Sequence, residues 1–197
     1  MKYKCIIFTE KDKSYIYVDD LETYYLNLEL LFKHIENTDS QHLIFSYISM
    51  CSATLEASLN QIIFEFYINK FGPTLYKKYT DSIINTNFSN KLHLIPTIVT
   101  ELKYTFDREC NTIKILEELI TMRNRVLHKK PSLNETFFEI GKANIGDNVK
   151  IEYTNYLKTI TFKKCRNYHD AIMNFKNDFL VPFYENDFGN SKILKCI

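Results

Sequence analysis

The sequence predicts a mainly α-helical protein, a bundle of four to five main helices with small β-hairpin additions. The chain has only four glycines and four prolines in 197 residues, and so few turn-forming residues favour long helices over a many-turned β fold. Several long stretches repeat apolar residues every three or four positions, as on the buried face of a helix. Two short stretches are instead rich in strand-forming residues on either side of a polar turn, which indicates hairpins.

Composition narrows the class of protein. The 25 basic and 24 acidic residues leave a net charge of +1, so no global basic field indicates a nucleic-acid binder. The five cysteines are widely spaced and form no zinc-binding pattern, which favours reduced thiols over a metal site or disulfides. No stretch approaches the roughly 20 apolar residues of a membrane helix. We therefore expect a soluble, cytoplasmic protein with one domain, 1–197, no metal and no cofactor.

The first elements are expected to be a hairpin and a helix. Two strand-forming runs surround the polar turn at 10–13, so residues 1–18 are predicted to form an N-terminal hairpin. Asp19 or Asp20 then suits a helix N-cap. The apolar spacing that follows predicts a helix from there to about 34–36.

The longest helix is expected over about 41–70, where one face stays apolar for about eight turns, and Gly72-Pro73 should end it. A short helix is expected over 75–84, followed by a polar link over 85–90. A second short helix is expected from about Pro96 to Phe106.

The rest of the chain is expected to hold two further long helices separated by a hairpin. The first of these helices covers about 109–128. Residues 132–156 carry two strand-forming runs around a glycine-containing turn and are predicted as a hairpin insertion. The last helix runs from about 157 to 179, and on to 184 past a kink at Pro182. The helical bundle therefore comprises residues 19–131 and 157–185.

The end of the helix at 109–128 gathers the residues that look chemically functional. Its apolar stripe is marked by Ile113, Leu116, Ile120 and Leu127. The stripe also includes Arg123, although burying an unpaired guanidinium is costly. Asn124 follows at once, and His128 lies one turn beyond it, shortly before Pro131 stops the helix.

Helix geometry leaves two interpretations of this cluster open. Asn124 and His128 share a face, whereas Arg123 and His128 are about 140° apart round an ideal helix. Arg123 and His128 could converge if two such helices faced each other across a two-fold axis, which suggests a composite site at a homodimer interface. In the structural alternative, Arg123 snorkels or pairs with a core acid while His128 complements the helix C-terminus. Glu56 is a candidate partner for Arg123, although a solvent-facing Glu56 is the simpler expectation.

The run RNRVLH resembles the R-x4-6-H motif of the HEPN superfamily, in which a polar residue, often Asn, follows the Arg. The motif positions here are Arg123, Asn124 and His128, and the helix layout is similar over roughly residues 20–185. The resemblance implies a HEPN-like four-helix bundle that dimerises with its motifs facing one another. Many members are metal-independent endoribonucleases of toxin–antitoxin or antiphage systems, and some have lost catalysis.

The resemblance gives the candidate residues roles that suit their chemistry. His128 would act as general base or acid because an imidazole titrates near neutral pH. Arg123 would clamp the phosphate in the transition state, and Asn124 would orient either group by hydrogen bonds.

The neighbouring basic residues suit flanking phosphates, with a solvated helix end as the equal alternative; they are Arg125, Lys129 and Lys130. The implied partners are RNA, with tRNA as one candidate, a second copy of the chain, and an antitoxin or defence-system protein. A non-catalytic HEPN-like module that binds RNA or nucleotide, and a plain helical interaction protein, are the other interpretations. His169, within the polar run 166–170, is a weaker candidate whose helical position also suits an exposed stripe.

Overall fold

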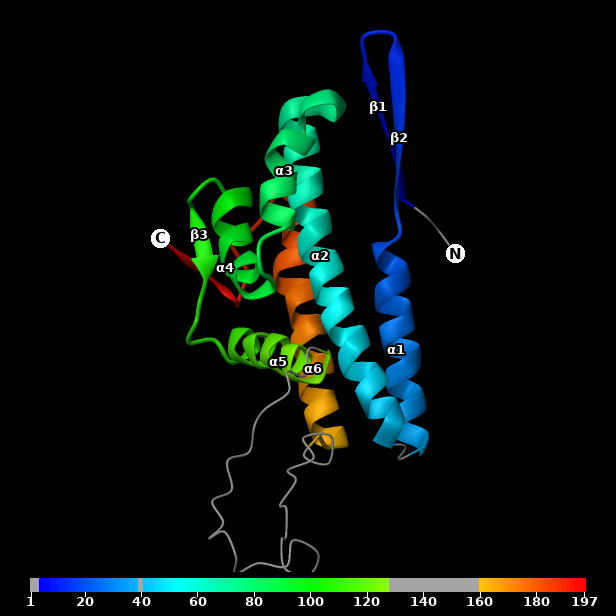
Figure 1. Ribbon diagram of the computed structural model, residues 1–197. Helices are drawn as coiled ribbons and strands as arrows, with labels where there is room; N and C mark the ends of the chain where they lie inside the picture. The colour runs from blue at the N-terminus through cyan, green and yellow to red at the C-terminus, as the bar shows by residue number, and fades with distance from the viewer. Residues whose placement is uncertain (1–3, 39–40, 128–159) are drawn as a thin grey trace, which may run out of the picture.

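The computed structural model of the chain describes residues 4–38, 41–127 and 160–197. These residues are mainly helical with two small antiparallel sheets, so the predicted class, all-α with small β additions, is confirmed at this level. Long helices lie alongside one another and a further helix crosses them (Figure 1). The helices that lie alongside one another are α1 (Leu21–Thr38), α2 (Gln41–Leu75) and α6 (Phe162–Phe175). The crossing helix is α5 (Asn111–Leu127).

The N-terminal hairpin forms as predicted. Strand β1 (Lys4–Glu10) pairs antiparallel with β2 (Lys13–Asp19), and Lys11 turns the chain between them with a φ of 55°. A two-stranded hairpin is only marginally stable alone. This one packs on α2, where the ring of Tyr17 lies 4.4 Å from that of Phe64, measured between centroids.

The first two helices begin and end close to their predicted limits. Asp19 Oδ1 accepts a hydrogen bond of 2.9 Å from the backbone N–H of Leu21, the first residue of α1. Asp19 therefore caps the start of the helix from one position before the N-cap residue, Asp20. In α2, Gly72 leaves the helical conformation with φ 75° and ψ 171°, a region that is essentially open only to glycine. Helical structure resumes after this break and reaches Leu75, five residues beyond the predicted end at about 70.

The segment after α3 (Lys77–Ile84) differs from the prediction. Asn87 caps the next helix by accepting a hydrogen bond of 2.8 Å from the backbone N–H of Asn90, so α4 (Phe88–Val99) begins within the predicted polar link. Pro96 lies inside α4 instead of starting a helix. The predicted helix from Pro96 to Phe106 is wrong.

A second small sheet was not predicted. After α4 the chain turns through positive φ angles at Glu101 and Leu102 and enters β3 (Tyr104–Phe106), which pairs antiparallel with β4 (Leu194–Cys196). These strands have three residues each and come from distant parts of the chain, so no local pattern identifies them.

The last helical segment is less regular than predicted. Within the described residues, α6 begins after Thr161, whose side chain accepts a hydrogen bond from the backbone N–H of Lys164. A π-helical segment, η2 (Lys176–Leu180), separates α6 from α7 (Val181–Glu185). The helical hydrogen-bond pattern therefore changes just before Pro182, the position where a kink was expected. The predicted hairpin insertion at 132–156 lies outside the described residues.

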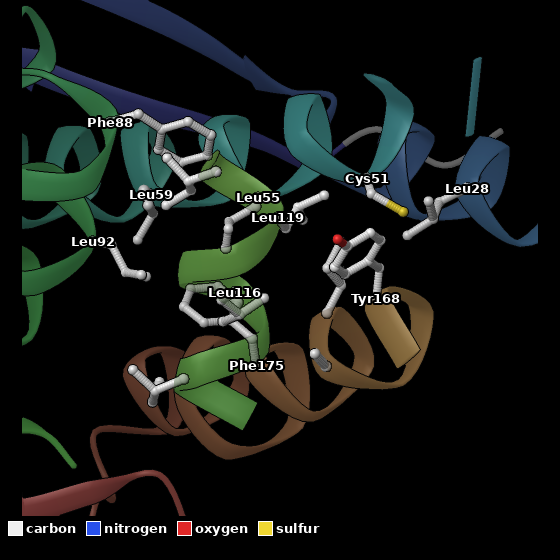
Figure 2. Packing of buried hydrophobic residues seen from close by; sticks show 14 of the residues in the cluster. Leu28, Cys51, Leu55, Leu59, Phe88, Leu92, Leu116, Leu119, Tyr168 and Phe175 are labelled. Carbon is white, nitrogen blue, oxygen red and sulfur yellow. The ribbon is translucent and has the colours of Figure 1, made fainter. Parts of the chain in front are cut away.

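The core lies where α5 meets α2, α4 and α6 (Figure 2). Five helices, α1, α2, α4, α5 and α6, contribute its labelled buried side chains, with α1 at the edge. In chain order these side chains are Leu28, Cys51, Leu55, Leu59, Phe88, Leu92, Leu116, Leu119, Tyr168 and Phe175. Each large apolar side chain buried here contributes roughly 1.5–3 kcal/mol. This packing fixes α5 firmly against its neighbours. None of the helices in the described part of the chain is long and apolar enough to span a membrane.

Candidate functional site

Three of the predicted site residues lie on the last turns of α5. The Arg123 side chain is 25% exposed, and those of Asn124 and Arg125 are exposed. The other three predicted site residues lie outside the described residues; they are His128, Lys129 and Lys130.

Arg123 occupies the edge of the core, as its place on the apolar stripe predicts. Ile113, Leu116 and Ile120, which precede it on that stripe, are fully or almost fully buried. The guanidinium carbon of Arg123 lies 5.7 Å from the centroid of the Phe88 ring on α4, within the range of a cation–π contact. One side of the guanidinium therefore faces protein while part of the group remains open to solvent.

Glu56 of α2 is the acidic partner of Arg123. The Arg123 Nη2 atom lies 3.4 Å from Glu56 Oε2, longer than the roughly 2.7–2.9 Å of a tight charge-assisted hydrogen bond. Arg123 Nη1 also donates to the neighbouring Asn124 Oδ1 at 3.3 Å. The simpler expectation of a solvent-facing Glu56 is wrong, because its side chain is only 31% exposed and pairs across the bundle.

Sequence reasoning missed two polar residues next to Glu56, Asn60 of α2 and the buried Lys91 of α4. The Lys91 side chain is 1% exposed, and its Nζ lies 2.8 Å from Asn60 Oδ1 and 3.5 Å from Glu56 Oε1. Burial lowers the pKa of Lys91, the Glu56 carboxylate opposes that shift, and the Arg123 charge adds to it.

A signal for Lys91 was present in the sequence. Phe88, Leu92, Ile95 and Val99 form the buried stripe of α4, and Lys91 stands within it at helical spacing. A lysine on an apolar stripe breaks the local pattern in the same way as Arg123 does on α5. Its importance was hidden because the predicted helix in this region began at Pro96, five positions too late to include Lys91.

Packing of three helices brings these polar groups together. On α2, Glu56 and Asn60 are four residues apart and share one helix face, each next to a core leucine that Figure 2 shows packed against α5. On α4, Lys91 precedes the buried Leu92, and on α5, Arg123 follows the buried Met122. We call this group the Arg123 cluster; it comprises Glu56, Asn60, Lys91, Arg123 and Asn124.

The Arg123 cluster has the chemistry of an anion-binding group. Two cations and one carboxylate leave it one formal positive charge. The guanidinium of Arg123 is partly exposed, and a guanidinium is planar, always charged and matched to the oxygens of a phosphate.

Comparisons with protein-family models, curated proteins and solved structures find no match for this chain. Within residues 4–38, 41–127 and 160–197, no three His, Cys, Asp or Glu side chains gather as a metal-binding group.

The pairing of Arg123 with an acid is also what the structural alternative predicts. The Glu56 contact is therefore shared by both interpretations. Two further features favour a binding role: the contact is long, and a second, buried cation, Lys91, shares the same carboxylate.

His169 forms a separate contact between helices. Its Nδ1 lies 2.7 Å from the hydroxyl oxygen of Tyr47, and its ring stacks on that of Phe32 with centroids 4.1 Å apart. Burial lowers the pKa of His169. Of the two expectations for this residue, the exposed stripe is wrong, and the contacts identify it as part of the packing between α1, α2 and α6.

A hollow of about 650 Å³ lies elsewhere, lined by the later part of α2, the α4–β3 segment and α7. Its buried carboxylate, Glu65, accepts hydrogen bonds from Gln61 Nε2 at 2.6 Å and from the Tyr184 hydroxyl at 3.2 Å. None of the predicted site residues that the structure describes lines this hollow. The candidate site therefore remains the Arg123 cluster.

Proposed function

We propose that this chain is a metal-independent endoribonuclease of toxin or antiphage-defence type, with a HEPN-like helical bundle and a composite Arg/His site at a homodimer interface. The observation that carries the proposal is Arg123 itself. This permanent cation lies at the edge of the core, is held by an acid from another helix, and keeps a quarter of its side chain exposed. In the sequence it precedes His128 by five residues.

The helix layout supports the HEPN-like part of the proposal. A long helix, α2, packs against the motif-bearing α5, and α6 closes the bundle against both. Arg123 and Asn124, the two motif residues that the structure describes, lie near the C-terminal end of α5, as the resemblance implies. The N-terminal hairpin and the β3–β4 sheet are additions at the outside of this arrangement.

The proposed reaction is transesterification within the RNA strand. The 2′-hydroxyl oxygen attacks the adjacent phosphorus, a new O2′–P bond forms, and the P–O5′ bond breaks. A base takes the 2′-hydroxyl proton and an acid gives a proton to the leaving 5′-oxygen, which leaves a 2′,3′-cyclic phosphate and a 5′-hydroxyl. His128 fills the base or acid role, Arg123 stabilises the crowded phosphorane, and Asn124 orients one of them.

A second copy of the chain completes the proposed site. Arg123 and His128 diverge by about 140° round an ideal helix, so one helix does not direct both at the same phosphate. Two facing α5 helices would bring the groups of both copies together. Flanking phosphates would then meet Arg125, Lys129 and Lys130, with cytoplasmic RNA, tRNA included, as substrate and an antitoxin or defence-system protein as the further partner.

RNA cleavage in the presence of EDTA tests the proposal. The wild-type protein is compared with Arg123→Ala and His128→Ala at equal concentration of folded dimer, on total RNA and tRNA. We expect cyclic-phosphate ends from the wild type and a loss of at least about a hundredfold in rate in each variant, the low end of what a general acid–base or a charge-stabilising group contributes.

Arg166→Ala is the matched control for Arg123→Ala. Arg166 also pairs with a glutamate, Glu36, at 2.8 Å and lies over an aromatic ring, so its loss removes similar contacts away from the motif. Its cleavage rate should equal that of the wild type. Equal background cleavage in every protein would count against the nuclease and favour the non-catalytic RNA- or nucleotide-binding module.

A further inference from the structure

We propose that Lys91 is a positioning residue of the Arg123 cluster: from inside the core it holds Glu56 and supplies the excess positive charge with which Arg123 meets a phosphate. The identity of that phosphate as RNA rests on the proposed function. The arrangement of charges rests on the contacts of three packed helices.

Lys91 stands where an apolar residue would be expected. Its side chain is 1% exposed, and its neighbours on the α4 stripe, Phe88, Leu92 and Ile95, are buried apolar residues. Taking an ammonium group out of water is costly, and well-packed apolar replacements of buried ion pairs are often neutral or stabilising. Stability alone therefore does not explain a lysine at this position.

The two oxygens of Glu56 contact two different cations. Oε1 lies 3.5 Å from Lys91 Nζ, and Oε2 lies 3.4 Å from Arg123 Nη2. Asn60, one turn along α2, accepts a shorter hydrogen bond of 2.8 Å from the same ammonium. Lys91 is thus fixed to one turn of α2, and Glu56 is held between a buried cation and a partly exposed one.

This sharing determines what an approaching anion experiences. With Arg123 alone, Glu56 would neutralise the guanidinium and would repel a phosphate next to it. With Lys91 present, Glu56 keeps a cationic partner when Arg123 turns toward the anion, and the cluster retains one positive charge. Lys91 is buried, so it acts through Glu56 and the local field and does not contact the ligand itself.

Binding of inorganic phosphate tests this inference without requiring catalysis. The probe is titrated at low ionic strength while the side-chain Nε–H signal of Arg123 is followed by NMR, with the signal of Arg166 as an internal reference. Lys91→Met should weaken phosphate binding at Arg123 by at least about tenfold, the effect expected for loss of one nearby, weakly screened charge. Lys91→Arg should retain binding.

A double variant separates the charge effect from damage to packing. Adding Glu56→Gln to Lys91→Met returns the cluster to one excess cation, so phosphate binding should recover toward the wild-type value. Damage to packing would not be repaired by a second substitution in the same cluster. If Lys91→Met does not fold, Lys91→Gln takes its place in the comparison. The glutamine amide removes the charge but can still donate a hydrogen bond to Asn60.

Two results would overturn the inference: phosphate affinity unchanged in Lys91→Met or Lys91→Gln, or no recovery in the double variant. RNA cleavage by the same proteins distinguishes failure of this inference from failure of the proposed function. Lys91-dependent phosphate binding without cleavage by the wild type would sustain the inference and count against the nuclease. Cleavage and phosphate binding both insensitive to Lys91 would sustain the nuclease and overturn the inference.

Discussion

At the scale of single residues, two basic side chains stand at apolar stripe positions on adjacent helices. Arg123 lies at the edge of the core and Lys91 lies within it, and both contact Glu56. The contacts resemble neither a tight buried salt bridge nor an exposed surface pair. Long ion-pair distances, a shared carboxylate and partial exposure suit a group that exchanges one partner for an anion.

Substitution of Arg123 by methionine separates the two interpretations of this residue by stability alone. We expect Arg123→Met to change the free energy of unfolding by less than about 1 kcal/mol, since loose, partly exposed pairs contribute little and Glu56 keeps Lys91 as a partner. Urea unfolding measures the change. A loss of about 3 kcal/mol or more, the cost of breaking a buried pair, would instead support the purely structural interpretation of Arg123.

At the scale of elements, α5 combines a rigid apolar face with a polar end. Leu116 and Leu119 pack into the core between α2, α4 and α6 (Figure 2), and Arg123 follows Leu119 by one turn. The packing that stabilises α5 therefore also fixes the position of the candidate site. A separate contact, that of His169 with Tyr47 and Phe32, joins α1, α2 and α6.

The His169 contact should make the bundle sensitive to mild acid. Burial lowers the pKa of His169 below its ordinary value of 6.5, so the folded state favours the neutral imidazole. The resulting stability is fully present above pH 6.5 and is lost as the pH falls through the folded-state pKa. Nearby carboxylates limit the shift by favouring the imidazolium; they are Asp170, Glu29 and Glu36.

Urea unfolding between pH 7 and pH 5 measures this effect. His169→Gln should lose less stability over that range than the wild type, because glutamine does not titrate. Tyr47→Phe removes the hydroxyl next to His169 Nδ1 but leaves the imidazole ring of His169 buried. The stability of this variant should therefore depend on pH as that of the wild type does. Identical slopes for the wild type and His169→Gln would contradict the prediction.

At the scale of the whole molecule, tyrosines with buried or partly buried side chains lie in five separate elements. Burial is the first cause that raises the pKa of tyrosines in β2, α1, α2, α6 and α7, namely Tyr17, Tyr25, Tyr47, Tyr168 and Tyr184. For Tyr17, burial raises the pKa from 10.0 to about 12. The folded state therefore resists ionisation of groups that titrate freely once the chain unfolds.

Alkaline pH should unfold the protein cooperatively. The stability due to these tyrosines is fully present below pH 10 and is lost as the pH rises toward the raised pKa values. Tyrosinate absorbance and helical circular dichroism should change together in one steep step, and the absence of tryptophan simplifies the absorbance. Tyr17→Phe should shift the step to higher pH. Gradual ionisation centred at pH 10 with no loss of helix would contradict this prediction.

The predicted fold agrees with the structure where local patterns decide it. The hairpin at β1–β2, the cap at Asp19, the long helix α2 and the helix carrying Arg123 follow from turn residues and apolar spacing. The predicted helix from Pro96 to Phe106 failed because proline is tolerated within α4, whose start is set by the Asn87 cap. The HEPN-like assignment and the ribonuclease activity stay predictions.

The sequence by itself determined the helical class and placed Arg123 and Asn124 at one helix end, because apolar periodicity and capping are local properties. Tertiary structure decided which groups surround Arg123. Glu56, Asn60 and Lys91 come from two other helices, and the β3–β4 pairing joins strands from distant parts of the chain. Such contacts depend on how the helices pack in space, so no spacing within one segment reveals that a buried lysine and a motif arginine share a single carboxylate.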